Sequence, residues 1–422
     1  MTVNVDQTGP EVVGTEPNAA GAVAAASDVV GLQQNVFALG WVSFFGGLSQ
    51  DMILPILPLF LAGTLGLNKE FIGLIEGVVT TAVSVLKILA GYASDRWRNR
   101  KQLVLVGYLF SALSRPALAL VGTGGQVLGL RFGDAVGKGV KDAPRDALIA
   151  GSSQLGKMGL SFGYHRMLDT FGSVLGPLVT FGLLILFSSL TQGDAYRLIF
   201  LLAGLPALLA VLVVVRFVHE RSSADQRWSG ISLSALRGHF AIFLGIMLVF
   251  TLGNSSDAFL ILRAQNVGVG VVAVPLVYAL FNLFYAALSL PAGSLSDRLG
   301  RRKVIAVGWL IYAAVYLGFG LADSAWQIWP LYALYGLYWA TTEGVTKAMV
   351  ADLVEPAQRG TAYGLFNASI GLMALPSSVI AGLLWDRVSP AAPFLFGAAM
   401  AALAVVLLLG LGLRPAQSVG AL

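Results

Sequence analysis

Hydrophobic residues in this chain gather in twelve long runs, each separated from the next by a short polar stretch. Each run approaches the roughly 20 residues that an α-helix needs to cross the hydrocarbon core of a bilayer. The pattern therefore predicts an all-α membrane protein with twelve transmembrane helices. The predicted spans are 36–62, 72–94, 103–121, 125–149, 160–188, 198–217, 241–263, 271–295, 304–321, 328–350, 361–385 and 394–413.

The fourth and tenth predicted spans are the least hydrophobic. The fourth contains Arg131, Asp134 and Lys138, and the tenth contains Glu343 and Lys347. Because a charged side chain in lipid is costly, we expect both spans to face protein or water.

Composition supports the membrane interpretation. Hydrophobic residues make up 56% of the chain and charged residues only 12%, which is about half the charged share of a soluble domain. The absence of cysteine excludes disulfides and thiolate metal sites. The histidines, His165, His219 and His239, fall in segments assigned to the cytoplasmic face, so we predict exposed loop residues and neither a metal site nor a cofactor.

Basic residues set the predicted orientation. Twenty Lys and Arg residues lie in or beside loops on one side, against four on the other, Lys69, Arg197, Arg263 and Arg387. This asymmetry places both termini in the cytoplasm, and it also explains the net charge of +5 without a nucleic-acid partner. The predicted location is a bacterial inner membrane or a membrane derived from it. The predicted domains are a disordered tail (1–34), a first bundle (35–217), a linker (218–240), a second bundle (241–413) and a short tail (414–422).

The two halves of the chain repeat one another. The stretch 91–101 recurs at 293–303, 202 residues later, Asp51 matches Asp257 at 206, and Gly139-Val140 matches Gly344-Val345 at 205. Three matches at nearly one offset indicate a parallel internal repeat of six helices, as in transporters that work by alternating access.

The repeated stretches resemble the G-x-x-x-D-R-x-x-R-R/K signature of the major facilitator superfamily. The first copy departs from it at Trp97 and Asn99, and the second matches throughout. The signature positions are Gly91, Asp95, Arg96, Arg100, Gly293, Asp297, Arg298 and Arg301. The resemblance covers about residues 36–413 and implies the major facilitator fold, with the signature as a latch of the outward-facing state. The glycines should let two helices approach closely. The alternative is a simple basic anchor at the cytoplasmic face.

The fifth span resembles the G-x8-G-x3-G-P motif of proton-coupled drug exporters. It carries Gly163, Gly172, Gly176 and Pro177, but Thr180 and Phe181 replace the glycine pair expected next. We expect these small residues to pack tightly against a partner helix. Generic helix packing is the alternative explanation.

Buried charged residues are the sharpest site candidates, because an unpaired charge in lipid costs several kcal/mol. They are Asp51, Asp257, Glu76, Arg131, Asp134 and Glu343. A carboxyl group in a poorly hydrated cavity can bind and release a proton near neutral pH. We expect the first two to meet near the membrane midplane, since each lies on the first helix of its half. The alternative for these acids is a buried structural pair with Lys87 or Arg131, and Arg131 could also pair with the acid at position 134.

The charge-rich segment 137–150 resembles a bacterial subset of the superfamily that includes siderophore-export and magnetosome-associated members. The sequence thus predicts a monomeric proton-coupled transporter that exports a small organic molecule, and not an enzyme. The alternative is transport of iron or an iron chelate, with a magnetosome membrane as a candidate location. A transporter-like sensor or assembly factor that moves nothing is the second alternative.

Overall fold

The computed structural model describes residues 28–29, 32–97, 99–153, 157–220, 238–355 and 358–411. It is almost entirely helical, and each predicted span coincides with one helix or with a broken pair. The first half contains β1 (Asp28–Val29), β2 (Leu32–Gln33), α2 (Gln34–Ile53), α3 (Leu57–Leu59), η1 (Phe60–Thr64), α4 (Lys69–Trp97), α5 (Arg100–Ala117), η2 (Leu118–Leu120), α6 (Gly124–Gly151), α7 (Met158–Leu186) and α8 (Gln192–Phe217). The second half contains α9 (Gly238–Gly253), α10 (Ala258–Asn266), η4 (Val271–Ala273), α11 (Val274–Leu299), α12 (Arg301–Leu321), α13 (Ala325–Leu353), α14 (Arg359–Arg387) and α15 (Ala392–Gly410).

Ten helical segments of the described chain are long and apolar enough to cross a membrane. The remaining two long helices are α6 and α13, which correspond to the predicted spans four and ten. Their charged residues lower their hydropathy, and the protein interior compensates for those charges, as described below. The all-α, twelve-span prediction is confirmed.

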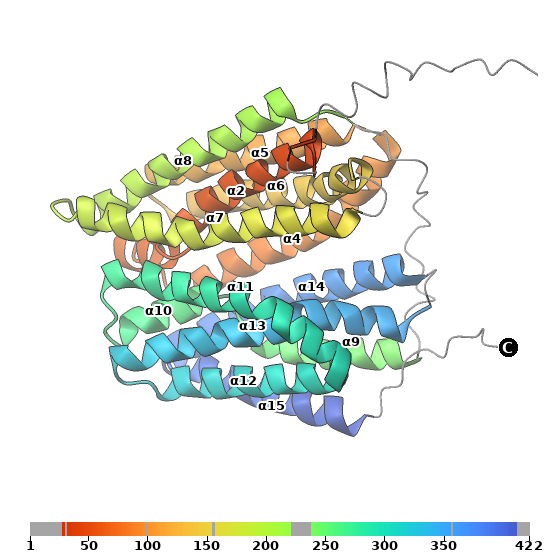
Figure 1. Ribbon diagram of the computed structural model, residues 1–422. Coiled ribbons are helices and arrows are strands. Elements are labelled where there is room, and N and C mark those ends of the chain that lie inside the picture. The colour runs from red at the N-terminus through yellow and green to blue at the C-terminus, as the bar shows by residue number, and fades with distance from the viewer. Residues whose placement is uncertain are drawn as a thin grey trace, which may run out of the picture.

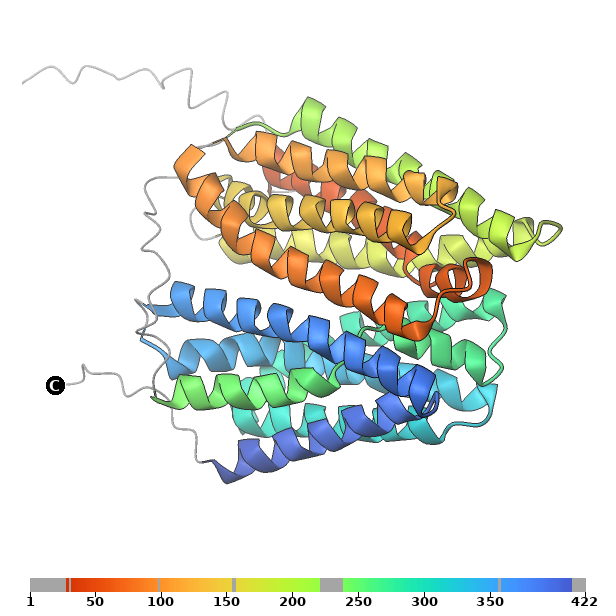
Figure 2. The same cartoon turned by 180° about the vertical axis from the view of Figure 1, so that it is seen from behind.

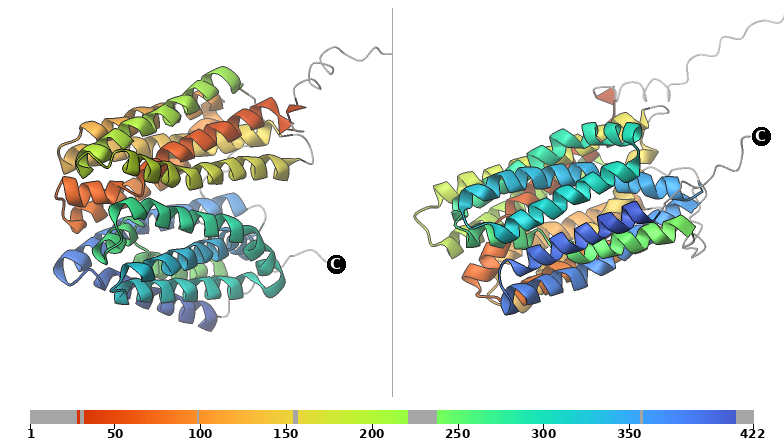
Figure 3. Two further views of the ribbon diagram at one scale, coloured as in Figure 1. Left: turned by 60° about the vertical axis from the view of Figure 1, so that its left-hand side comes forward. Right: turned by 90° about the horizontal axis from the view of Figure 1, so that it is seen from below.

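The helices form two bundles, α2 to α8 and α9 to α15, which lie one above the other in Figure 1 and in the left view of Figure 3. Equivalent helices make equivalent contacts: α2 packs on α8 as α9 packs on α15, and α5 packs on α6 as α12 packs on α13. The contacts between bundles are also related by the repeat, with α4 against α14 and α7 against α11. This correspondence agrees with the internal repeat in the sequence.

The first helix of each half is broken, but at different places. In the first half the α-helix ends at Ile53 and Pro55 follows, which has no backbone N–H to continue the hydrogen-bond ladder. In the second half α9 ends at Gly253, and residues 254–256 are not helical. Asp51 therefore lies inside an intact helix, whereas Asp257 follows the break.

The bundles are in close contact at the end of the molecule that lies away from the termini. A Cβ atom added at Gly73 of α4 would lie 2.2 Å from the Ser378 carbonyl oxygen of α14. The backbone N–H of Glu70 donates to the Asp386 carboxylate over 2.8 Å, and the Arg387 guanidinium lies 3.6 Å from the Glu70 carboxylate. Figure 2 shows the orange α4 and the blue α14 converging at this end. We call it the far end, and the end where α2 begins and α15 ends (Figure 1) the termini end.

The predicted tails and linker are described only at their edges. Residues 28–29 pair with 32–33 in a small antiparallel hairpin, so part of the predicted disordered tail has a regular conformation. The rest of the tail up to residue 31, residues 221–237 of the linker and the C-terminal tail lie outside the described residues.

Candidate functional site

A cavity of about 1250 Å³ lies between the two bundles. Its lining includes Gly91, Asp146 and Thr361, which lie towards the termini end of α4, α6 and α14. The cavity therefore opens towards the termini end, while the α4–α14 contact closes the far end. If the predicted orientation holds, this is the inward-facing state.

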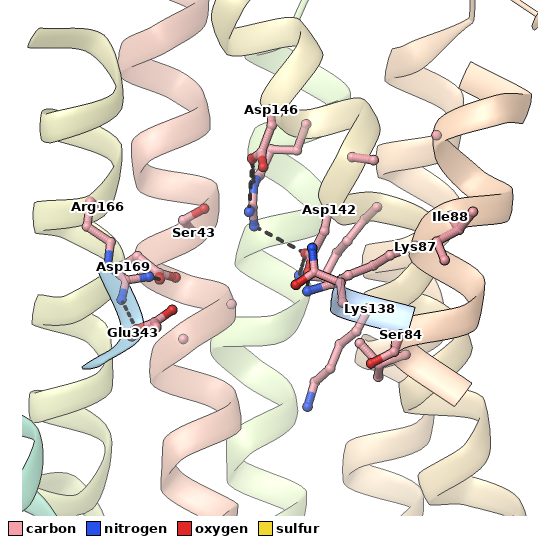
Figure 4. Close-up of a pocket in the computed structure, with 18 of the residues that line it drawn as sticks. Ser43, Ser84, Lys87, Ile88, Lys138, Asp142, Asp146, Arg166, Asp169 and Glu343 are labelled. Atoms are coloured by element: carbon pink, nitrogen blue, oxygen red, sulfur yellow. Dashed lines mark hydrogen bonds and ion pairs between the residues drawn. The ribbon is translucent and has the colours of Figure 1, made fainter. Parts of the chain in front are cut away.

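The lining is strongly charged. Six basic and five acidic side chains of the described chain face the cavity: Lys87, Lys138, Lys141, Arg145, Arg166, Lys347, Asp51, Asp142, Asp146, Asp169 and Glu343. Most belong to α4, α6 and α7, and Figure 4 shows several of them gathered on the two walls. Such a lining suits a polar or charged molecule better than a lipophilic one.

Asp51 lies in the wall of this cavity and is only 5% exposed. The Ser173 side chain of α7 faces its carboxylate, and the charges of Asp169, Lys138 and Arg115 act on it. Among the five acids that line the cavity, Asp51 is the one with no Lys or Arg nitrogen within 4.0 Å in the described chain. Its charge can therefore change without breaking a direct ion pair.

The α7 glycines divide into two kinds. A Cβ atom at Gly172 would lie 2.4 Å from the Phe44 carbonyl oxygen, and one at Gly176 would lie 2.8 Å from the carbonyl carbon of Asp51. These two glycines pack tightly, as expected. For Gly163 the expectation was wrong, because no atom of the described chain lies within 4 Å of its Cβ position.

Other residues of the same motif support the α2–α7 contact. Pro177 is buried within α7 and leaves the helix continuous. Thr180 stands where the exporter motif has glycine, and its hydroxyl donates to the Met52 carbonyl over 2.7 Å. The departure from the motif therefore adds a hydrogen bond between the two helices.

A buried charge network lies behind the cavity wall in the first bundle. The Asp134 carboxylate lies 3.1 Å from the Arg115 guanidinium, 3.2 Å from the Lys138 ammonium and 3.8 Å from the Arg131 guanidinium. Arg131 also lies 3.0 Å from Glu76. The alternative of structural ion pairs therefore describes Glu76, Arg131 and Asp134 in this structure. Our sequence interpretation missed Arg115, although an arginine inside an apolar span is itself a signal.

The alternative of an ion pair with Lys87 does not describe Glu76, because the Lys87 ammonium lies 2.8 Å from the Asp142 carboxylate. The prediction of exposed loop histidines was wrong in part. His165 is not an exposed loop residue: it lies within α7, is 7% exposed, and its Nε2 lies 2.5 Å from the Ser43 hydroxyl. The linker residue His219 is exposed, as expected, whereas His239 is half-buried in the first turn of α9 and does not lie in a loop.

Asp257 does not join Asp51. It is absent from the cavity lining, and it accepts a 2.6 Å hydrogen bond from the Tyr335 hydroxyl. The charge of Glu76 also acts on Asp257. The expected meeting of the two matched aspartates fails because α9 breaks before Asp257, whereas the first-half helix breaks only after Asp51.

Glu343 lies on the opposite wall of the cavity. Its carboxylate is 3.1 Å from Lys347 and 3.5 Å from Arg166, and it accepts a hydrogen bond from the Tyr285 hydroxyl. Because Arg166 belongs to α7 and Glu343 to α13, this contact joins the two bundles beside the cavity (Figure 4).

The signature glycines do not make the expected close contacts in this conformation. A Cβ atom at Gly91 would lie 3.9 Å from the Ala143 Cβ, which is ordinary contact, and no described atom lies within 4 Å of a Cβ at Gly293. Gly91 lines the open cavity, so its neighbours stand apart there. The latch role of the signature stays a prediction.

The charged signature positions are described only in part. In the second copy Arg301 lies 2.7 Å from Asp297 and 2.9 Å from Asp352, which ties α12 to α11 and α13. Arg298 is exposed and Arg100 is buried. The side chains of Asp95 and Arg96 lie outside the described residues.

Comparison with known proteins settles the family. The family model described as Major Facilitator Superfamily matches residues 39–256 and 238–421. The chain belongs to the Major Facilitator Superfamily. It is 36% identical over 386 residues to an uncharacterised MFS-type transporter of Methanocaldococcus jannaschii, covering 90% of this chain and 95% of that one. It is also 22% identical over 393 residues to a homologue of the multi-drug resistance efflux pump PmrA of Lactococcus lactis, covering 87% and 93%.

A solved major facilitator structure shares the fold. The chain superposes on a variant of the nucleoside transporter NupG with a TM-score of 0.77, at 15% identity, over 89% of this chain and 99% of that one. The protein is therefore a multi-pass membrane transporter of this superfamily, a family of transporters and not of enzymes.

Proposed function

We propose that the protein is a proton-coupled secondary transporter that exports a small polar organic molecule by alternating access. The observation that carries the proposal is the position of Asp51. It lies in the wall of a charged cavity that is open at one end, and no cation of the described chain lies within ion-pair distance.

Protonation of Asp51 would change the charge of the cavity by one. The other acids that line the cavity each have a Lys or Arg partner within 4.0 Å, so protonation of any of them would give up a direct ion pair. Asp51 can bind a proton without that loss. The close α2–α7 contact at Gly176 would also link the protonation state of Asp51 to the packing of two transmembrane helices.

The tightly packed α7 glycines and the likeness to a multi-drug resistance efflux pump homologue support export as the direction. The six basic and five acidic residues of the lining favour a charged cargo. The same excess of basic groups disfavours a bare iron cation, although an iron chelate that carries carboxylates would suit it. The working unit is proposed to be a monomer in a bacterial inner membrane, with both termini cytoplasmic.

The test begins with the cargo. Compounds retained by cells that lack the protein are identified by mass spectrometry, then loaded into proteoliposomes under an imposed pH gradient. We expect gradient-driven movement with the wild-type protein, loss of that movement in Asp51→Asn, and normal movement in Asp323→Asn. The control residue Asp323 is exposed and precedes α13 at the far end.

Other results would redirect or reject the proposal. Full gradient-driven transport by Asp51→Asn would move the proton site elsewhere, with Glu76 and Asp134 as the next candidates. Lower cargo in cells that lack the protein would make it an importer. If no compound moves under any gradient, the non-transporting sensor becomes the better hypothesis.

A further inference from the structure

Three basic side chains converge on one carboxylate in the wall formed by α4 and α6. Asp142 lies 2.8 Å from the Lys87 ammonium, 3.6 Å from the Lys141 ammonium and 3.5 Å from the Arg145 guanidinium. All four residues line the cavity, and Figure 4 shows Lys87 reaching across to Asp142. We call these four residues the Asp142 cluster.

The Asp142 cluster contains more positive charge than its acids can balance. The Asp146 carboxylate also lies 3.1 Å from the Arg145 guanidinium. Its side chain is 53% exposed and lies towards the mouth of the cavity. With both carboxylates ionised, three cations face two acids. The Lys87 side chain is 46% exposed, so a solute in the open cavity can reach the cluster. Its excess positive charge attracts a ligand that brings a negative charge.

The cluster does not act as a clasp between the bundles. Its residues belong to α4 and α6, which pack against each other within the first bundle. By contrast, the Arg166–Glu343 pair on the opposite wall does join the bundles. The concentration of cations on one wall therefore needs an explanation other than holding this conformation closed.

An unused hydrogen-bond donor lies beside the cluster. Tyr108 of α5 lines the cavity and is 2% exposed, and its hydroxyl has no hydrogen-bond partner in the described part of the chain. The Lys141 ammonium lies 4.3 Å from the centre of its ring. A buried hydroxyl without a partner is unfavourable, and an oxyanion bound at the cluster could accept its hydrogen bond after a small rotation.

Close helix packing fixes the position of Lys141. A Cβ atom at Gly107 of α5 would lie 2.5 Å from the Lys141 Cβ and 2.5 Å from the Gly137 carbonyl oxygen. The stem of Lys141 therefore rests against a glycine face, which limits its freedom and prepares the site for a ligand.

We propose that the Asp142 cluster and Tyr108 form a subsite for a carboxylate or phosphate group of the cargo, which makes the cargo a small organic anion or zwitterion. This inference rests on the proposed transport function and deepens it. Lys87 and Lys141 supply point charges. The Arg145 guanidinium, whose Nε and Nη2 already donate to Asp146, adds a third positive charge.

The first test measures the charge of the site without knowledge of the cargo. Because the chain has no cysteine, Ser84→Cys introduces a single thiol into the cavity lining, one helical turn from Lys87. Its reaction rates with anionic sulfonatoethyl and cationic trimethylammonioethyl methanethiosulfonate are compared, each normalised to a free thiol. We expect the anionic reagent to react faster. Lys141→Gln or Lys87→Gln should each lower the rate ratio about threefold or more, whereas Lys69→Gln at the far end should leave it unchanged.

The second test uses citrate as a probe anion and choline as its cationic counterpart. Citrate should slow modification of the Ser84→Cys thiol by uncharged N-ethylmaleimide, and choline should not. The Lys87→Gln/Lys141→Gln double variant should lose the protection while keeping its elution profile and thermal unfolding midpoint.

Two outcomes would overturn the proposal: a rate ratio that favours the cationic reagent, or protection by choline and not by citrate. Neither measurement uses a proton gradient. If Asp51→Asn kept its gradient-driven transport, the proposed proton site would fail while the anion subsite could still stand.

Discussion

Gly176 of α7 lies directly against the backbone of Asp51 on α2. A Cβ atom at Gly176 would lie 2.8 Å from the Asp51 carbonyl carbon and 2.9 Å from its Cβ atom. At Gly176, α7 therefore contacts Asp51, the residue that we propose to carry the proton. Only the hydrogen atom of the glycine lies between the two. Any side chain at this glycine would have to displace one helix or the other.

Gly176→Ala should consequently harm both stability and transport. Overpacking of a tight contact costs typically 1–3 kcal/mol, so the thermal unfolding midpoint in detergent should fall and gradient-driven transport should slow. Gly163→Ala is the matched control on the same helix, because its Cβ would meet open space. Equal effects of the two substitutions would contradict the packing argument.

These two glycines show what a motif can and cannot predict. The spacing in the fifth span correctly indicated a helix that packs through small residues, at Gly172 and Gly176. The spacing gave no reason to expect that Gly163 would lack the close contact made by the other two glycines. The positions at which two helices touch depend on the angle between them, here between α2 and α7. That angle is set by tertiary packing and not by the residues of one helix.

The Arg131–Glu76 pair should behave as a coupled unit in stability measurements. Glu76→Gln removes the 3.0 Å partner of Arg131, and Arg131→Gln removes a partner of both Glu76 and Asp134. Loss of one partner from a buried pair costs about 3–5 kcal/mol, so each single variant should unfold at a clearly lower temperature. The double variant should lose less than the two single losses together.

A double-mutant cycle followed by thermal unfolding measures that coupling. Arg387→Gln with Glu70→Gln is the comparison pair, because its 3.6 Å contact is exposed and exposed pairs contribute about 0–1 kcal/mol. Purely additive losses in the Arg131–Glu76 cycle would show that the two residues act independently.

Asp257 should matter for folding more than for coupling. In Asp257→Asn the amide oxygen can still accept the Tyr335 hydrogen bond, so we expect most transport activity to remain. Tyr335→Phe leaves the carboxylate without that 2.6 Å donor, and an unsatisfied buried group costs about 1–3 kcal/mol. The ordering of thermal midpoints, with Tyr335→Phe lowest, checks this account. Loss of pH-driven transport in Asp257→Asn at normal stability would place Asp257 in the proton path.

The matched aspartates illustrate why the sequence could not complete the site. Hydrophobic runs predicted every span, and the charges of spans four and ten lie in the protein interior or at the cavity. The repeat placed Asp51 and Asp257 at equivalent positions, yet the structure separates them. The helix breaks at 254–256 in one half and after residue 53 in the other, and a break of a few residues rotates everything that follows. Tyr108 was overlooked because its role depends on neighbours from other helices, whereas Arg115 did carry a signal, an arginine inside an apolar span.

The last prediction concerns the balance between the two open states. The far end is closed by the contact between α4 and α14, where a Cβ at Gly73 would lie 2.2 Å from the Ser378 carbonyl oxygen. Backbone cannot move aside as a flexible side chain can, so Gly73→Leu should destabilise this closed contact. A conformation with the far end open relieves the clash, and the population should shift towards it. Each 1.4 kcal/mol of difference changes the ratio of the two states tenfold.

Labelling of the Ser84→Cys thiol measures that shift, using a membrane-impermeant maleimide on vesicles of each orientation. In Gly73→Leu, labelling from the termini side should fall by about tenfold, and labelling from the far side should rise, for an overpacking cost of about 1–3 kcal/mol. Gly129→Leu on α6 is the control, because no described atom lies within 4 Å of its Cβ position. Unchanged sidedness in Gly73→Leu, in protein that remains folded, would mean that the α4–α14 contact does not hold the far end closed.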